Sequence, residues 1–356
     1  MNGYRRALAT LRRETTDSVA TWAGWIVSDK FFEYVTGKYF WDNPRRVAFE
    51  AYRKLEVDIV LQTLFLPASP DEYREFTDDS VVAQDKFQNP EAIVQYIDTL
   101  LKPEQIEKEF NWEEQVKAHR QEYEKFQNEL GNEIFAMPKC KCARFIWYLN
   151  FGYENYLQAM ALYPDAITKL YRCNATEMRL LNQVRVELVK QKVMPPYFFC
   201  GHDICGQTGP IASPQMLRNL YFPWLKYSLE PLVQIGAEIV WHCDGYIPPI
   251  LNDLAEAGVS GFQGFQEETG FDIKYVAQQK VRNGKTPLLW AGLSVARTLP
   301  KGTVEQVKQE VKRIIDSVAS NGGLAIGTAN TAGPDCPSEN LEAMYKYVHE
   351  YHSHAF

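Results

Sequence analysis

The sequence predicts an α/β fold, because short apolar strands alternate with amphipathic helices through the second half of the chain. Five strand–helix units follow one another between residues 196 and 351. The strands, such as Glu238–Cys243, are mostly apolar, as expected when helices cover both faces of a parallel sheet. Such units build either a closed barrel or a doubly wound sheet. No Gly-x-Gly-x-x-Gly follows a strand, which disfavours a dinucleotide-binding sheet.

The first half of the chain is less regular. Residues 1–54 predict a helical N-terminal extension, and Leu55–Phe65 predicts a buried strand that carries Asp58. The charged stretch from about residue 89 to 131 predicts a helical insertion or cap, either a lid or the arm of a homodimer. Ala143–Leu149 predicts another strand. No linker rich in Gly, Ser or Pro interrupts the chain, so we expect one domain over residues 1–356.

The second half is delimited by clear start and stop signals. Thr303 with Gln306 three residues later predicts a capping box, and Gly236, Gly258 and Gly322 follow helices where positive φ is common. The predicted strands are Pro196–Cys200, Glu238–Cys243, Val259–Phe262, Pro287–Trp290 and Leu324–Gly327. The predicted helices are Pro164–Gln191, Pro214–Gln234, Pro248–Ala257, Asp272–Lys280, one from Thr303, and Pro337–Tyr351. The total is seven strands, and we expect an eighth between Phe65 and Asn89.

Composition excludes several classes of function. The 356 residues carry 38 Lys and Arg against 45 Asp and Glu, a net charge of −7, which argues against nucleic acid as a partner. No apolar run is long enough to cross a membrane, and the N-terminus lacks the apolar stretch of a secretory signal. The seven cysteines are odd in number and form no Cys-x-x-Cys pair, which indicates reduced thiols. We therefore expect a soluble cytoplasmic protein.

His242 and Asp244 are the sharpest candidates for chemistry. Reactive groups of α/β barrels gather at the carboxyl ends of strands. Residues two apart on a strand point to the same side, so His242 and Asp244 are predicted to converge while Cys243 faces away. The pair can bind a divalent metal or act as a general base oriented by an acid. The alternative is a polar core layer, in which Asp244 only holds a neutral His242.

Other strand ends supply further candidates. His202 or Asp203 could join His242 in a metal site, with Cys205 as a softer alternative, or Asp203 could cap a loop. Glu267 is a carboxylate candidate for the metal. The predicted substrate-binding residues are Trp22, Trp25, His202, Gln266, Trp290 and Asn330.

Four stretches in the second half of the chain, in the same order as in the family, resemble the uroporphyrinogen decarboxylase superfamily, which includes the corrinoid-dependent methyltransferases. They are HDICGQTGPIASPQMLRNLYFPWLK, GAEIVWHCDGYIPPILNDLAEAGVSGF, LLWAGLSVARTLPKGTVEQVKQEV and PDCPSENLEAM. Asp58 also fits the family's first strand. The resemblance implies a single TIM (β/α)8 barrel.

The methyltransferase branch is the more similar one. The decarboxylases carry an Arg-rich N-terminal motif, but no arginine stands between Arg13 and Arg45 here. The methyltransferases bind zinc through His-x-Cys and a later Cys. His242 matches the histidine, whereas Asp244 and Ala329 stand near the two cysteine positions and Cys336 comes later. Zinc or another divalent metal would therefore meet nitrogen and oxygen ligands, which suit an oxygen-bearing substrate.

The resemblance implies a methyltransferase that moves a methyl group from a small donor, such as an aromatic methyl ether, to a corrinoid carried by a partner protein. One alternative is a cofactor-free decarboxylase or lyase, in which Asp58 or Asp244 stabilises a protonated intermediate. Another is a barrel that binds a ligand without turnover.

Overall fold

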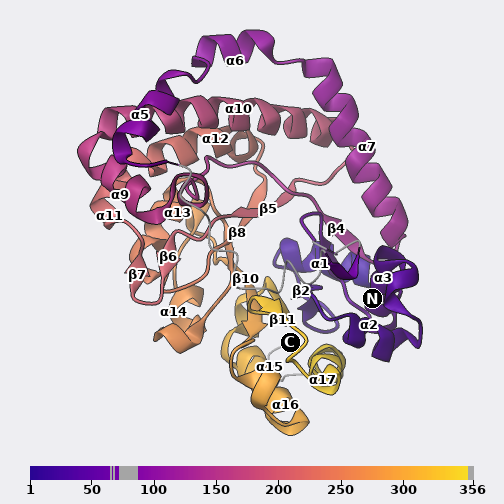
Figure 1. Ribbon diagram of the computed structural model, residues 1–356. Coiled ribbons are helices and arrows are strands. Elements are labelled where there is room, and N and C mark those ends of the chain that lie inside the picture. The colour runs from indigo at the N-terminus through magenta and orange to yellow at the C-terminus, as the bar shows by residue number, and fades with distance from the viewer. Residues whose placement is uncertain (65, 67–68, 72–86, 352–356) are drawn as a thin grey trace.

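Eight parallel strands close into a ring in the computed structural model, which describes residues 1–64, 66, 69–71 and 87–351 (Figure 1). Six strands pair in the order β1-β11-β10-β9-β8-β5, and β3 pairs with β4. Bridges from Trp22 to Ile59 and from Lys139 to Phe199 join the two groups and complete the circle. The strands of the ring are β1 (Ala20–Thr21), β3 (Ile59–Leu61), β4 (Phe135–Met137), β5 (Tyr197–Gly201), β8 (Glu238–His242), β9 (Gly261–Gln263), β10 (Leu288–Leu293) and β11 (Leu324–Thr328). The fold is therefore the predicted TIM barrel.

The interior of the barrel is filled by side chains from alternate strand positions. They form one buried cluster, which includes Trp22, Ile59, Leu61, Phe135, Met137, Phe199, Val240, Leu288, Trp290 and Ala325. Ala7 and Leu11 of α1 (Gly3–Leu11) belong to the same cluster, so α1 closes the amino end of the barrel. The packed interior leaves chemistry to the carboxyl ends of the strands.

Helices cover the outside of the ring. They are α2 (Asp29–Thr36), α3 (Pro44–Lys54), α5 (Pro90–Asp98), α6 (Pro103–Glu109), α7 (Trp112–Leu130), α8 (Tyr148–Phe151), α9 (Tyr153–Leu162), α10 (Pro164–Lys190), α11 (Pro214–Leu220), α12 (Phe222–Gln234), α13 (Leu251–Glu256), α14 (Ile273–Ala277), α15 (Thr298–Lys301), α16 (Val304–Val318) and α17 (Ser338–Glu350). No described helix combines the length and the apolar composition that a membrane span requires.

Short elements lie at the ends of the ring. β2 (Trp25–Ile26) pairs with β12 (Thr331–Ala332), and β6 (Cys205–Gly206) forms a hairpin with β7 (Gly209–Pro210). The 3-10 helices are η1 (Phe40–Asp42), η2 (Pro248–Ile250), η3 (Glu267–Thr269), η4 (Arg282–Gly284) and η5 (Ala319–Asn321).

The predicted start and stop signals of the second half are confirmed. Thr303 and Gln306 form the capping box of α16, and Gly236, Gly258 and Gly322 all have positive φ. All seven cysteines are free thiols, as expected.

Two predictions in the first half are wrong. Ala143–Leu149 is not a strand, because its apolar run leads into α8, and the strand lies earlier, at β4. A short apolar run does not distinguish a strand from a buried helical segment. Residues 1–54 are not only a helical extension, since they supply β1. The eighth strand expected between Phe65 and Asn89 falls largely outside the described residues, and β1 and β4 complete the ring without it.

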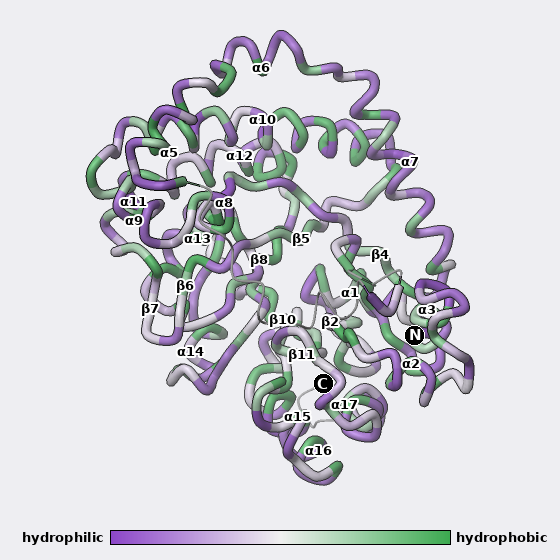
Figure 2. The backbone as a smooth tube through the Cα atoms, viewed as in Figure 1, coloured by the Kyte–Doolittle hydropathy of each residue, from purple (hydrophilic) through white to green (hydrophobic). Residues whose placement is uncertain are grey.

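Residues 89–131 form α5, α6 and α7, which run along the outer side of α10 (Figure 1). The residues of α6 and α7 are largely hydrophilic, whereas many residues of the barrel strands are hydrophobic (Figure 2). None of residues 89–131 lines the cavity beside His242. The segment therefore belongs to the outer wall of the molecule.

Candidate metal and substrate site

His242, Asp244 and Asp203 meet at the carboxyl ends of β8 and β5. His242 is the last residue of β8, and its Nε2 lies 3.4 Å from Oδ1 of Asp203 and 3.9 Å from Oδ1 of Asp244. One ligand atom from each residue lies within 4.8 Å of the other two. Cys243 packs instead in the outer hydrophobic cluster. The structure thus brings His242 and Asp244 together, and adds Asp203.

Gln263, at the end of β9, sets the orientation of the His242 ring. Its Oε1 lies 2.6 Å from Nδ1 of His242, and its Nε2 donates to the carbonyl of Ala329 at 3.0 Å. Because the amide nitrogen is occupied, Oε1 must accept, and we assign a proton to Nδ1. Nε2 is therefore the ring atom that faces the two carboxylates. Gln263 is fully buried, and no sequence pattern marks it as a site residue.

The carboxylates are held by the loops after β5, β8 and β11. Asp203 accepts from the backbone N–H of Asp244 at 3.0 Å, and Asn330 donates to Oδ2 of Asp244 at 2.5 Å. Gln266 accepts from the N–H of Gly245 at 2.9 Å. Asn330 and Gln266, both predicted to bind substrate, thus position the loop that carries Asp244.

The charges of the three groups are coupled. Burial lowers the pKa of His242, but its hydrogen bond to Asp203 and the charges of Asp244 and Asp203 outweigh burial and raise the pKa to about 9. Burial would also raise the pKa of Asp203, yet the hydrogen bond and charge of His242 lower it. Burial raises the pKa of Asp244 to about 6, against the opposing charge of His242. The two carboxylates therefore favour the protonated, positively charged imidazole of His242.

These residues fit a divalent metal ion. The donor set is one imidazole nitrogen and two carboxylates, which zinc and other first-row divalent metals accept. Oδ1 of Asp244 is buried and has no hydrogen-bond partner among the described residues, although it faces the imidazole. A cation would satisfy this atom. The hydrogen bond that the other ring nitrogen, Nδ1, donates to Gln263 is the usual support of a metal-bound histidine.

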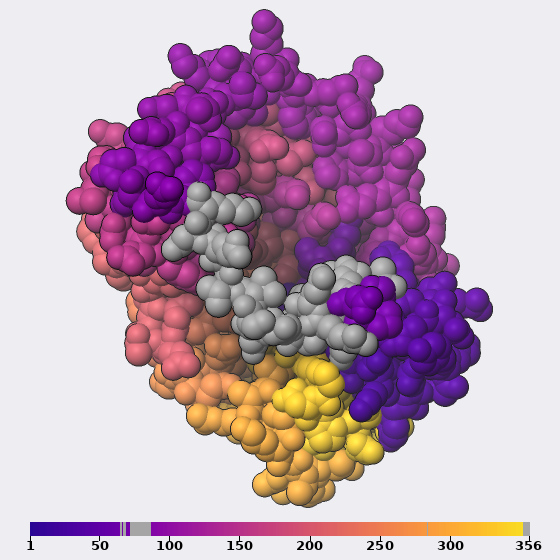
Figure 3. Space-filling model, in the orientation of Figure 1, coloured from indigo at the N-terminus to yellow at the C-terminus, as the bar shows by residue number. Residues whose placement is uncertain are grey.

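A cavity of about 610 Å³ opens beside His242. Trp25 and Phe199 line it, and the ring of Trp25 meets the ring of His242 edge-on, with 4.7 Å between centroids. Much of the remaining lining comes from residues that follow β4 and from residues on one side of α10. Figure 3 shows the molecule hollowed on the face where the rose-coloured helices meet the indigo N-terminal residues. The cavity is of the size that binds a small organic molecule.

Two residues predicted to bind substrate lie in the core of the barrel. Trp22 and Trp290 are both 0% exposed and pack inside the barrel with their ring centroids 5.9 Å apart. Inward-facing residues of a small barrel fill its core, and of these three tryptophans it is Trp25, nearer the carboxyl ends of the strands, that lines the cavity.

Two predicted ligands lie elsewhere. Nε2 of His202 is 3.3 Å from the thiol of Cys142, and His202 lines the cavity without joining the three-residue cluster. Glu267 forms an ion pair with Arg313 of α16 and accepts from the N–H of Ile273. Because neighbouring side chains on a loop point in different directions, Asp203 lies in the cluster with His242 and Asp244, and His202 does not.

Asp58, predicted as a catalytic residue, lies at the end of the barrel opposite to His242. It is fully buried just before β3, at the amino end of the barrel, where Nη1 of Arg6 donates to its Oδ1 at 2.6 Å. The N–H of Thr21 donates to its other oxygen at 2.8 Å. Asp58 therefore ties α1 to β1 and β3, at the end of the barrel where buried polar residues contribute stability.

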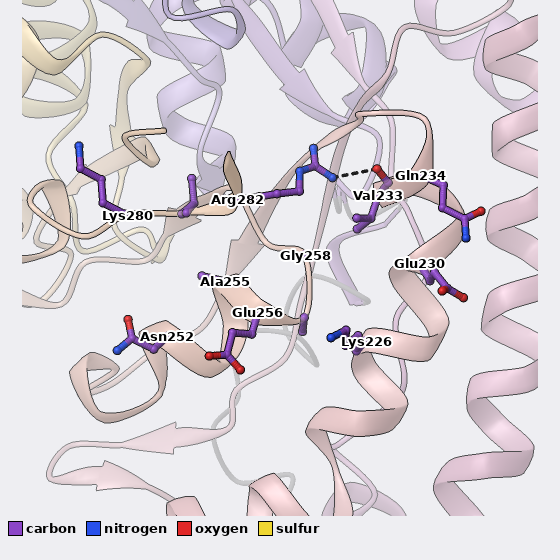
Figure 4. A pocket seen from close by; sticks show the side chains of 12 residues that line it. Lys226, Glu230, Val233, Gln234, Asn252, Ala255, Glu256, Gly258, Lys280 and Arg282 are labelled. Carbon is purple, nitrogen blue, oxygen red and sulfur yellow. Dashed lines mark hydrogen bonds between the residues drawn. The ribbon is translucent and has the colours of Figure 1, made fainter. Parts of the chain in front are cut away.

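A second cavity, of about 570 Å³, lies between α12, α13 and the segment before β10. Figure 4 shows Lys226, Glu230 and Lys280 around it, with Arg282 donating to the carbonyl of Val233. These helix ends lead into the starts of strands, so the cavity is on the amino side of the barrel. It contains no predicted site residue.

Comparison with known proteins agrees with this architecture. A methyltransferase from Methanosarcina mazei has a similar structure, with a TM-score of 0.64 and 16% sequence identity over 98% of this chain and 99% of that chain. At this identity the likeness concerns the fold. No curated protein matches the sequence. The family model for uroporphyrinogen decarboxylase (URO-D) matches residues 151–351, more than half of the chain, and includes β5, β8 and their site residues. The chain therefore belongs to the uroporphyrinogen decarboxylase family.

Proposed function

We propose that this protein is a metal-assisted methyltransferase, which takes a methyl group from a small donor, such as an aromatic methyl ether, and passes it to a corrinoid carried by a partner protein. The observation that carries the proposal is the arrangement of Asp203, His242 and Asp244 beside a cavity with an aromatic wall. The resemblance of the site-bearing segments to the methyltransferase branch supports the same reaction.

The chemistry requires stabilisation of the leaving oxygen. The bond between methyl carbon and oxygen breaks, the electron pair stays on the oxygen, and the methyl group goes to the acceptor. A bound divalent metal would supply Lewis-acid polarisation of that oxygen. His242, Asp203 and Asp244 would hold it.

The remaining residues bind and orient. Trp25 offers its face to the ring of an aromatic donor and excludes water from the side of His242. Gln263 keeps Nε2 turned towards the carboxylates, and Asn330 holds Asp244. Positioning of this kind accounts for a large share of catalysis in transfer reactions.

The variant His242→Ala tests the proposal. We expect loss of stoichiometric zinc, measured by elemental analysis, and at least a hundredfold loss of corrinoid methylation across a panel of methyl ethers, because the only nitrogen ligand of the described cluster is removed. His119→Ala on α7 is the matched control and should retain both. Full activity of His242→Ala would refute the proposal.

The same measurements separate the alternatives. A decarboxylase would release CO2 without stoichiometric metal, and Asp244, which lies beside His242 and whose pKa is raised to about 6, is its candidate acid. A ligand-binding barrel would bind methyl ethers without turnover.

A further inference from the structure

Two cations line the cavity beside His242 without an acidic partner. The segment after β4 contributes Lys139, Lys141 and Arg144 to the wall. Nζ of Lys139 is neutralised by Glu122, at 2.7 Å. Within the described part of the chain, neither Lys141 nor Arg144 forms an ion pair through its side chain. Positive charge in a cavity of an acidic protein therefore calls for an explanation.

Arg144 has unused hydrogen-bond donors. Its Nε is buried and has no hydrogen-bond partner among the described residues, and the same is true of Nε1 of Trp147. The guanidinium lies over the Trp147 ring, 4.8 Å from its centroid, which fixes the orientation of both side chains. Buried donors cost free energy unless an acceptor meets them. The pair therefore forms a prepared surface for an acceptor.

Other cations surround Lys141. Burial lowers the pKa of Lys141, and the charges of Arg185 and Lys139 lower it further. Arg185 is buried and donates to the carbonyls of Lys139 and Leu181, both at 2.7 Å, so it has no acid to offset it in these bonds. Among the described residues that line the cavity, the acidic one is Glu177, and its side chain is exposed on α10. An anion in the cavity would lower the electrostatic energy of this wall.

Aromatic rings connect the cationic wall to His242. Trp147 stacks under Arg144, and Trp25 meets His242, and both indoles line the same cavity. A flat ligand that lies along these indoles would present one end to Arg144 and Lys141 and the other to the metal site. Arginine binds a carboxylate through two parallel hydrogen bonds, a geometry that lysine and amides do not provide.

We propose that the substrate is an aromatic methyl ether that carries a carboxylate, which Arg144 and Lys141 bind while the ether faces His242. That this aromatic ether is the methyl donor rests on the proposed function. The carboxylate subsite rests on the cavity wall alone. Neither residue belongs to the metal cluster.

The test compares binding of 4-methoxybenzoate with that of its uncharged analogue 4-methoxybenzamide, by isothermal titration calorimetry on the full-length protein loaded with zinc. We expect the acid to bind at least tenfold more tightly than the amide. Arg144→Gln should remove this preference by weakening the acid at least tenfold and leaving the amide unchanged, and Lys141→Gln should weaken the acid in the same direction. Lys226→Gln, which removes a lysine from the second cavity (Figure 4), is the matched control and should change neither.

Binding of the amide also shows that each variant is folded. Equal affinity of the unmodified protein for acid and amide, no binding of either, or an equal loss of both in Arg144→Gln would overturn the carboxylate subsite. Methyl transfer from neutral ethers at undiminished kcat/KM would overturn it while leaving the proposed function standing. Tight, Arg144-dependent binding of the acid without methyl transfer would support the carboxylate subsite and overturn the proposed function.

Discussion

At the scale of single residues, the site depends on a side chain that touches neither the carboxylates nor the cavity. Gln263 joins the His242 ring to the backbone of Ala329 and so connects the ends of β8, β9 and the loop after β11. Without it the imidazole would be free to turn about its χ2 angle and could present either nitrogen to a metal ion bound there. Supports of this kind typically change metal affinity by about 10- to 100-fold.

Gln263→Leu is expected to weaken zinc binding by about 10- to 100-fold, because the ring loses the acceptor that fixes its orientation. Competition with a chromophoric chelator measures the affinity. Gln278→Leu, an exposed glutamine at the end of α14, is the control. An unchanged affinity in Gln263→Leu would show that the carboxylates alone orient the metal.

At the scale of elements, the loop after β8 determines where Asp244 lies. Gly245 has φ +85°, and a Cβ there would stand 2.4 Å from the carbonyl oxygen of Gly206 in β6. The next residue, Tyr246, donates its N–H to that same oxygen at 2.8 Å. A side chain at position 245 would therefore push the loop away from β6 and carry Asp244 with it.

Gly245→Ala is expected to lower both stability and zinc affinity, because it adds a steric clash to the strain of a left-handed backbone. Gly236→Ala separates the two effects: its φ is +75°, but nothing lies within 4 Å of the added Cβ. That control should cost about 1 kcal/mol of unfolding free energy, from the backbone alone, and leave zinc affinity unchanged. Urea unfolding and zinc titration measure the two quantities. Equal effects of both substitutions would contradict the steric argument.

At the scale of the whole molecule, the last helix secures the closure of the barrel. Tyr345 of α17 donates to the carbonyl of Ala23 at 2.6 Å, and Nε2 of His349 lies 3.0 Å from the carbonyl oxygen of Glu56. These contacts clamp α17 over β1 and the turn before β3, where the ring is joined by a single bridge. Burial lowers the pKa of His349, and the charge of Arg6 lowers it further.

This shift predicts a pH-dependent stability. A histidine whose pKa is lower in the folded state binds fewer protons there than in the unfolded chain, so the free energy of unfolding falls as the pH falls through and below about 6.5. In His349→Gln this contribution is absent, and we expect a shallower loss of stability between pH 7 and pH 5 in urea unfolding. If the free energy of unfolding of His349→Gln fell with pH as steeply as that of the unmodified protein, His349 would be excluded as a source of the pH dependence.

Local patterns determined much of this protein. The strands of the second half and the capping box at Thr303 follow from side-chain periodicity and backbone preferences within a few residues. These features depend on residues close together in the chain, so the sequence alone was sufficient to predict them.

Tertiary structure alone decided the rest. Which strand ends meet depends on register between segments that are far apart in the chain, so Asp203 faces His242 while His202 turns to Cys142. The same cause places Asp58 at the amino end of the barrel and buries Trp22 and Trp290 in its core. Gln263 and Arg144 acquire their importance only from the atoms around them, and no local pattern encodes those atoms.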